Sequence, residues 1–226
     1  MSDNQKTLNS SIDFTGVGLH TGEDVHMVIE PAKINHGVKF QRIDLESQPI
    51  LPADINLVTD TQRSTTLEKD NVKIVTVEHL MSALYALGVN NVLIKMDSSE
   101  VPILDGSAKY FVDEIQKVGL KVQDASLKYI DLPNPIHYTD PDSGSEILFV
   151  PTNNFIISVV LDYQNLALGT QYAEIRDLKD YSTEIAPCKT FVFLTELEKL
   201  SKANLIKGGG LENAIVVVDR EDTKPS

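Results

Sequence analysis

Apolar residues at positions 76–88 recur at the spacing of one helical face. Side chains at i, i+3, i+4 and i+7 lie on the same side of a helix, and this spacing is met by Leu80, Ala83, Leu84 and Leu87. Gly88 can end such a helix in the left-handed conformation, and Thr76 can cap its first turn. The pattern predicts an amphipathic helix whose first turn carries Glu78 and His79.

This first turn places a carboxylate next to an imidazole. The helix dipole at this end favours an ionised Glu78 and a neutral His79. Neutral imidazole is the metal-binding form, and a neighbouring carboxylate that is not a ligand can act as a general base toward metal-bound water. In the alternative interpretation, His79 is a helix-start residue with ordinary hydrogen bonds, since one ligand is not a coordination sphere.

Alternating and continuous apolar runs flank this helix and predict strands. These strands are expected at residues 23–30, 38–43, 72–75 and 90–96. A second helix is expected at residues 108–118, capped by Ser107 and stopped by Gly119.

A polar stretch at residues 123–127 marks the boundary between two halves of the chain. Three strands are expected after this boundary, at residues 128–132, 146–150 and 155–163. A short helix at residues 180–186, a long amphipathic helix at 195–205 and a final buried strand at 213–218 are expected to follow. The similar order of elements in the two halves is consistent with a remote duplication.

Three polar segments have two interpretations each. The glycines of GVGLHTG, residues 16–22, either form a structural turn or bring the backbone close to another element or a ligand. The run DTQRSTT, residues 60–66, is either a surface loop or part of a cleft wall. Asp105 lies in a tight turn, where a carboxylate usually bonds nearby backbone amides; a functional carboxylate is the alternative.

Composition narrows the classes of function. The 226-residue chain has a formal net charge of -13, which argues against a large nucleic-acid-binding surface, because that requires clustered Lys and Arg. A single cysteine, Cys188, excludes an intrachain disulfide and fits a reducing cytoplasm. No secretory signal is visible, and no apolar run approaches the ~20 residues of a membrane span. We therefore expect a cytoplasmic protein.

Six stretches of the chain, taken together and in order, resemble one enzyme family. They read GVGLHTG, DTQRSTTL, TVEHLMSAL, VPILDGSAKYF, CKTFVFLTELEKL and KGGGLENAIVVVD. Each alone is weakly specific, but their joint order resembles the UDP-3-O-acyl-N-acetylglucosamine deacetylases (the LpxC family), zinc enzymes of lipid A biosynthesis in Gram-negative bacteria. The segments KFQRIDLE and NLIKGG are most similar to the Bacteroidetes-type members, in which the deacetylase can be fused to a 3-hydroxyacyl carrier protein dehydratase.

The resemblance implies an α+β fold of two similar two-layer domains, each a mixed sheet with a layer of helices. The helix layers would face each other around the active site. The first domain would span residues 1–125 and the second residues 126–226, with the segment that forms the acyl passage at about residues 193–218. The second domain is expected to be incomplete, with part of its apolar surface uncovered.

The implied reaction is hydrolysis of the N-acetyl amide of UDP-3-O-(3-hydroxyacyl)-N-acetylglucosamine. By resemblance, His79 is a ligand of Zn2+, and Glu78 is the general base that removes a proton from zinc-bound water. Thr190 would donate a hydrogen bond to the tetrahedral oxyanion. Asp105 matches an acidic position near the catalytic centre.

The resemblance also assigns the residues that hold the substrate. Leu19 and Phe191 would flank the sugar and the catalytic centre. Leu197, Ala214 and Val216 belong to the segment that forms the hydrophobic passage for the acyl chain, which needs an apolar channel to leave water.

The chain departs from the family pattern at Ser64, where many members have Cys, and at Lys189, where many have Arg. A larger departure concerns the metal, because the family's other two zinc ligands, in a His-Lys-x-x-Asp motif, and its general-acid His lie downstream of the last matched strand. A catalytic zinc site takes three protein ligands. We therefore expect activity in the full-length protein and none in these 226 residues alone.

Two other classes of function remain as alternatives. One is a non-catalytic module that binds an acyl lipid or a partner, and the other is a structural or interaction protein. For the enzyme, the expected partners are the UDP-linked acyl-glucosamine substrate, a fused dehydratase domain downstream and, through the amphipathic substrate, the surface of the inner membrane.

Overall fold

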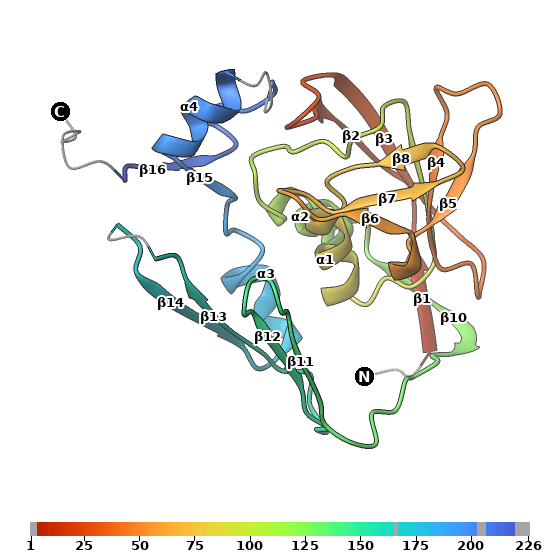
Figure 1. Ribbon diagram of the computed structural model, residues 1–226. Coiled ribbons are helices and arrows are strands. Elements are labelled where there is room, and N and C mark those ends of the chain that lie inside the picture. The colour runs from red at the N-terminus through yellow and green to blue at the C-terminus, as the bar shows by residue number, and fades with distance from the viewer. Residues whose placement is uncertain (1–3, 165–166, 203–206, 220–226) are drawn as a thin grey trace.

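The computed structural model describes residues 4–164, 167–202 and 207–219. It has one five-stranded sheet, several small sheets and few helices, so the fold is of the α+β class, as the sequence predicted. Figure 1 shows the large sheet in the first half of the chain with two helices beside it, and the strands of the second half apart from that sheet.

The five-stranded sheet has the order β2-β3-β9-β4-β5. Its strands are β2 (Ile12–Val17), β3 (Asp24–Pro31), β9 (Val92–Met96), β4 (Val38–Arg42) and β5 (Ile50–Pro52). Strand β9 pairs antiparallel with β3 and parallel with β4, so the sheet is mixed. The apolar side of β3 (Val25, Met27 and Ile29) is buried, as its alternation predicted.

Helices α1 (Glu78–Ala86) and α2 (Lys109–Val118) pack into the same core as this sheet. The predicted apolar face of α1 is buried at Leu80, Ala83 and Leu84. Gly88 has a φ of 72° and Gly119 a φ of 72°, so both predicted helix stops are confirmed.

Two smaller sheets complete the first half of the chain. Strand β1 (Asn4–Leu8) pairs with β10 (Leu120–Ser126), so the residues that mark the predicted boundary return to the start of the chain. A short 3-10 helix, η1 (Ile55–Leu57), precedes the antiparallel sheet of β6 (Val58–Asp60), β7 (Thr66–Lys69) and β8 (Val72–Ile74). Strand β8 confirms the prediction at residues 72–75.

The second half begins with two antiparallel hairpins. They pair β11 (Ile136–Thr139) with β12 (Glu146–Phe149), and β13 (Ile157–Asp162) with β14 (Thr170–Ile175). Strands β12 and β13 lie within the segments predicted at residues 146–150 and 155–163. The strand predicted at residues 128–132 is wrong. Strand β12 pairs with β11, because these two segments directly flank a short turn.

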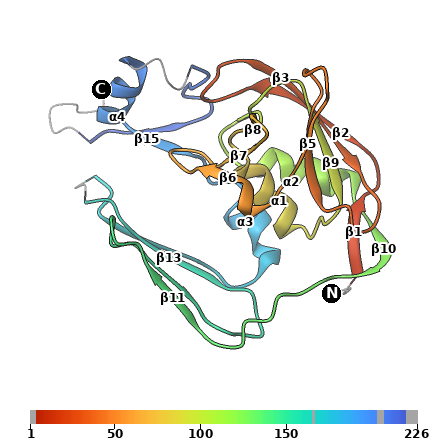
Figure 2. The same ribbon diagram turned by 45° about the vertical axis from the view of Figure 1, so that its right-hand side comes forward.

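Many large apolar side chains of these hairpins are exposed to solvent. Leu148 is 62% exposed, Val160 66% and Tyr172 62%. Figure 2 shows the hairpins on the far side of α1 from the five-stranded sheet. This surface agrees with the uncovered apolar area expected in the second half.

The last elements are short. The 3-10 helix η2 (Leu178–Asp180) and helix α3 (Tyr181–Glu184) form at the helix predicted for residues 180–186. Strand β15 (Phe191–Phe193) leads into helix α4 (Leu194–Lys202) and pairs in parallel with β16 (Ile215–Val217).

Helix α4 begins one residue before its predicted start, and its predicted continuation, residues 203–205, lies outside the described residues. Strand β16 confirms the final strand, but the prediction that it is buried is wrong. Ile215 is 51% exposed, because within the described residues β15 is the only strand that pairs with β16.

Candidate active site

The first turn of α1 carries Glu78 and His79, but Thr76 does not cap it. The helix follows Val77, whose side chain makes no capping hydrogen bond. The Thr76 hydroxyl donates instead to Oε1 of Glu100 at 2.7 Å, and Thr76 has a φ of 60°. The predicted cap is therefore wrong, because the Thr76 hydroxyl is oriented toward a buried carboxylate distant in sequence and not toward the N–H groups of the first turn.

The carboxylate of Glu78 holds the polar DTQRSTT run against the helix. Its Oε2 accepts a hydrogen bond from the backbone N–H of Thr65 at 3.0 Å. Both Glu78 and His79 are half-buried. The run therefore borders the candidate site, which favours the cleft-wall interpretation for this part of it.

The environment of His79 favours the neutral imidazole. Burial lowers the pKa of His79 from its usual 6.5, and the charges of Glu78 and Asp105 act in the opposite direction. The lowered pKa agrees with the predicted neutral imidazole, but its main cause is desolvation and not the helix dipole. A neutral imidazole has an unprotonated ring nitrogen that can bind a metal.

An apolar pocket of about 210 Å³ lies beside the DTQRSTT run, whose Arg63 lines it. Residues from the GVGLHTG loop, β15, α4 and β16 line it. All five substrate-binding residues expected from the resemblance contribute, and so does the expected catalytic residue Thr190: Leu19, Phe191, Leu197, Ala214, Val216 and Thr190. The structure thus brings together side chains from both halves of the chain.

Sequence reasoning missed two polar residues of this pocket, His20 and Arg63. His20 is adjacent to Leu19, and its ring Nε2 is buried without a hydrogen-bond partner within the described part of the chain. Arg63 is the single cation of the DTQRSTT run. Their positions within two motifs already singled out were the signal that could have identified them.

Close backbone contacts between the two halves shape the pocket. The N–H of Gly208 donates to the carbonyl of Leu19 at 3.0 Å, and a Cβ at Gly208 would lie 2.1 Å from the carbonyl oxygen of Gly18. The N–H of Thr190 donates to the carbonyl of Gly106 at 2.8 Å. A Cβ at Gly22 of the GVGLHTG loop would lie 2.7 Å from Cβ of Lys207, so this glycine allows close approach to another element, which was one of the two interpretations.

Asp105 lies outside this pocket. Its Oδ1 accepts hydrogen bonds from the backbone N–H of Ser107 at 3.1 Å and from the Ser107 hydroxyl at 2.7 Å. Lys189 Nζ lies 3.7 Å from the other carboxylate oxygen, and both residues line a separate shallow surface pocket. The turn interpretation of Asp105 is thus confirmed, and its charge also reaches His79.

The donor set for a metal is incomplete. His79 offers one neutral imidazole, and residues 4–164, 167–202 and 207–219 contain no group of three His, Cys, Asp or Glu side chains placed to hold a metal ion. A catalytic zinc site needs three protein ligands, so the described residues do not by themselves fit a zinc ion.

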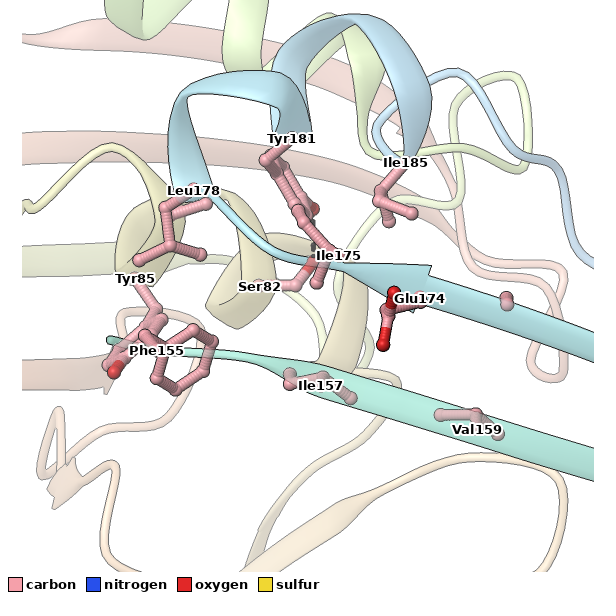
Figure 3. A pocket seen from close by; sticks show the side chains of 12 residues that line it. Ser82, Tyr85, Phe155, Ile157, Val159, Glu174, Ile175, Leu178, Tyr181 and Ile185 are labelled. Carbon is pink, nitrogen blue, oxygen red and sulfur yellow. Dashed lines mark hydrogen bonds between the residues drawn. The ribbon is translucent and has the colours of Figure 1, made fainter. Parts of the chain in front are cut away.

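A second apolar cavity, of about 290 Å³, lies between α1 and the hairpin of β13 and β14. Figure 3 shows Tyr85 and Phe155 side by side at one end of it and Tyr181 from α3 above Ser82. The rings of Tyr85 and Phe155 are 5.2 Å apart, and the hydroxyls of Tyr181 and Ser82 are 2.6 Å apart. Ser82 and Tyr85 follow Glu78 by four and seven residues, so the face of α1 that carries Glu78 contacts the second half of the chain.

Within the described residues, no helix is long and apolar enough to cross a membrane.

Comparison with known proteins gives consistent matches. A family model described as UDP-3-O-acyl N-acetylglycosamine deacetylase matches residues 5–225. The chain is 46% identical over 222 residues to the bifunctional enzyme LpxC/FabZ of Bacteroides thetaiotaomicron, covering 98% of this chain and 48% of that protein. It is 41% identical over 222 residues to the UDP-3-O-acyl-N-acetylglucosamine deacetylase of Chromohalobacter salexigens, covering 95% of this chain and 71% of that protein. The chain spans about half the length of the bifunctional relatives that it matches.

Proposed function

We propose that this chain, which belongs to the UDP-3-O-acyl N-acetylglycosamine deacetylase family, forms part of the active site of a hydrolase of lipid A biosynthesis. The proposed reaction is hydrolysis of the N-acetyl amide of UDP-3-O-(3-hydroxyacyl)-N-acetylglucosamine. The activity belongs to the full-length protein.

The observation that carries this proposal is the apolar pocket that borders the same DTQRSTT run as Glu78. Arg63 lines the pocket, and Thr65, two residues further on, is bonded to Glu78. A substrate that joins a long acyl chain to a polar sugar would place the chain in the pocket and the sugar near the carboxylate. Each methylene group removed from water contributes about 0.8 kcal/mol, so the chain supplies much of the binding energy.

Glu78 and Thr190 are the proposed catalytic residues. Glu78 would accept a proton from the water that attacks the acetyl carbonyl, which makes the water a better nucleophile. The Thr190 hydroxyl would donate a hydrogen bond to the oxyanion that then forms. Leu19 and Phe191 would flank the sugar, and Leu197, Ala214 and Val216 would contact the acyl chain.

The family is zinc-dependent, and His79 is the proposed ligand from this part of the chain. The described residues offer one of the three protein ligands that a catalytic zinc takes. We therefore assign no reaction step to the metal here, and propose that the ligand set is complete in the full-length protein. Asp105 would act from outside the ligand set, through its charge near His79.

The proposed domain organisation follows the same family. Residues 1–125 would form the first two-layer domain and residues 126–226 the second, with the acyl-passage segment at about residues 193–218. The position of α1 between the five-stranded sheet and the β13–β14 hairpin supports helix layers that face each other (Figure 2). The exposed apolar hairpins support an incomplete second domain.

A fused dehydratase domain is proposed as a partner, because the relatives from Bacteroides thetaiotaomicron and Porphyromonas gingivalis are named as bifunctional LpxC/FabZ enzymes. The amphipathic substrate would also bring the protein into peripheral contact with the inner membrane.

The proposal is tested with the full-length protein and UDP-3-O-(3-hydroxymyristoyl)-N-acetylglucosamine. Acetate release is measured before and after removal of the metal by a chelator, and again after zinc is returned. We expect release to stop with the chelator, to return with zinc and to fall by roughly 10²–10⁴ in Glu78→Ala. Near wild-type release by Glu78→Ala would show that the general base is another residue.

The runner-up function, a non-catalytic module that binds the acyl lipid, gives a different result in the same experiment. The substrate would bind, acetate would not be released, and Glu78→Ala would bind as well as the wild type.

A further inference from the structure

A buried carboxylate, Glu100, joins two segments of the candidate active site. Its side chain is 0% exposed. It accepts hydrogen bonds from the GVGLHTG loop and from Thr76, which lies two residues before Glu78. The proposed chemistry makes no use of this group.

We propose that Glu100 is a positioning residue that locks the loop carrying Leu19 and His20 onto the turn that begins α1. It would touch no substrate atom. Its effect would be to hold the wall of the apolar pocket in a constant place relative to Glu78. The inference rests on the proposed function only for its catalytic consequence, since the coupling between loop and turn is a property of the fold.

The loop side of this link is built around the carboxylate. Oε2 of Glu100 accepts the backbone N–H and the hydroxyl of Thr21, both at 2.9 Å, and the N–H of His20 lies 3.1 Å from each carboxylate oxygen. Gly18 makes room for this approach, because a Cβ there would lie 2.5 Å from Oε2. The loop conformation is therefore fitted to the position of Glu100.

On the side of the turn before α1, one hydrogen bond to Glu100 stabilises Thr76 in an unfavourable backbone conformation. Thr76 has a φ of 60°, which β-branched residues rarely adopt. Its hydroxyl lies 2.7 Å from Oε1 of Glu100, and the preceding Val75 forms a parallel bridge with Glu100. The neighbouring backbone and side-chain contacts together fix the direction in which the chain enters α1.

The chemistry of the link makes the two sides depend on each other. Among the described residues, the donors to Glu100 are amides and hydroxyls, and no Lys or Arg pairs with it. A fully buried carboxylate is costly to leave with unsatisfied oxygens, so it favours the arrangement in which all its donors are present. A shift of the Thr76 turn is therefore transmitted to the loop.

This coupling matters for catalysis because the loop and the turn carry different parts of the site. Leu19 and His20 line the apolar pocket, whereas Glu78 lies in α1. A displacement of about 1 Å between a bound substrate and a catalytic group can reduce the rate by as much as roughly 10²-fold. Loss of the link would thus reduce kcat more than it weakens binding of the acyl chain.

The test uses a matched pair of threonines in the full-length protein. Thr76→Val removes the hydroxyl with little change of shape, and Thr76→Ser keeps it. Thr7→Val is the control, because Thr7 is 3% exposed, as Thr76 is, and its hydroxyl also makes buried hydrogen bonds, to the carbonyl of Asn91 and from the N–H of Ala32. Neither Thr7 nor its two partners line the apolar pocket.

The first measurement is amide hydrogen exchange, which does not depend on activity. We expect the N–H groups of His20 and Thr21 to exchange at least about tenfold faster in Thr76→Val than in the wild type. Thr76→Ser and Thr7→Val should leave them protected. Unchanged protection in Thr76→Val, or equal loss in Thr7→Val, would overturn the proposed coupling.

The second measurement is deacetylation at a temperature at which melting curves show every variant folded. We expect Thr76→Val to lower kcat by roughly tenfold or more with a much smaller change in KM, and Thr76→Ser to restore most of it. A normal kcat in Thr76→Val would reduce Glu100 to a stabilising role. A wild-type protein without deacetylase activity would contradict the proposed function, and hydrogen exchange would still decide whether the coupling exists.

Discussion

Nη2 of Arg63 lies 2.9 Å from Oε1 of Glu196. Arg63 belongs to the polar run between β6 and β7, and Glu196 to the first turn of α4, so the pair links the two halves beside the apolar pocket. The side chains are 44% and 39% exposed. Water and salt screen a pair this exposed, so it orients the polar run more than it stabilises the fold.

Arg63→Met is therefore expected to lower the free energy of unfolding by less than about 1 kcal/mol, with the difference shrinking at high salt. Denaturation in urea measures this value. Arg42→Met is the control, because Arg42 pairs with Asp44 through two nitrogens and is only 11% exposed. A loss for Arg63→Met as large as that for Arg42→Met would contradict the prediction.

Gly106 and Gly144 allow a second prediction, because they share a backbone conformation and differ in their surroundings. Their φ angles are 81° and 71°. A Cβ at Gly106 would lie 1.8 Å from the carbonyl oxygen of Asn213, whereas one at Gly144 would meet nothing within 4 Å. Both alanine variants lose about 1–2 kcal/mol to the left-handed backbone.

Gly106→Ala should lose about 1–3 kcal/mol more than Gly144→Ala, because it also forces the two halves apart. It should lower acyl-lipid binding as well, since the carbonyl of Gly106 accepts the N–H of Thr190 in the pocket wall. Thermal unfolding and a fluorescent acyl probe measure the two effects. Equal losses in the two variants would show that the chain accommodates the added methyl group.

The protonation of His79 gives a prediction for the metal-free protein. Burial lowers its pKa in the folded state, so below about pH 6.5 the unfolded chain binds more protons than the folded chain. The contribution of His79 to stability is therefore complete above pH 6.5 and is lost as the pH falls below it. Imidazole NMR resonances should show His79 less than half protonated at the pH at which an unfolded histidine is half protonated.

His79→Gln identifies the resonance and removes this part of the pH dependence of unfolding. A His79 resonance that titrates above pH 6.5 would contradict the burial argument.

Neighbouring residues of β16 test the acyl passage. Val216 lines the pocket, whereas Ile215, the preceding residue of the strand, is 51% exposed and does not. Val216→Phe should raise KM for a long-chain substrate by roughly tenfold or more and spare a short-chain one, because the larger ring fills the passage. Ile215→Phe should change neither value. Equal effects on both substrates would place the acyl chain elsewhere.

Several elements followed from local sequence patterns. The apolar spacing of α1 and the stop at Gly88 predicted its extent to within two residues at each end, because a helix is held together by bonds between residues four apart. The alternation in β3 predicted its buried side for a similar local reason. The family resemblance, carried by motifs in order, named six of the residues that line the pocket.

Tertiary structure decided the features that depend on residues far apart in the chain. The local pattern of residues 128–132 predicted a strand, but the strand that pairs with β12 is β11, directly across the turn. The inclusion of His20 and Arg63 in the pocket followed from contacts between the two halves, which no local pattern encodes.

Thr76 shows most clearly which features the sequence determines and which the tertiary structure decides. Its sequence position predicted a helix cap, because a hydroxyl before a helix usually bonds the free N–H groups of the first turn. The sequence by itself determined that the first turn of α1 carries a carboxylate and an imidazole. Only the folded chain brought Glu100 within 2.7 Å of the Thr76 hydroxyl, and this charge-assisted hydrogen bond orients the hydroxyl toward Glu100 and not toward the free N–H groups of the first turn.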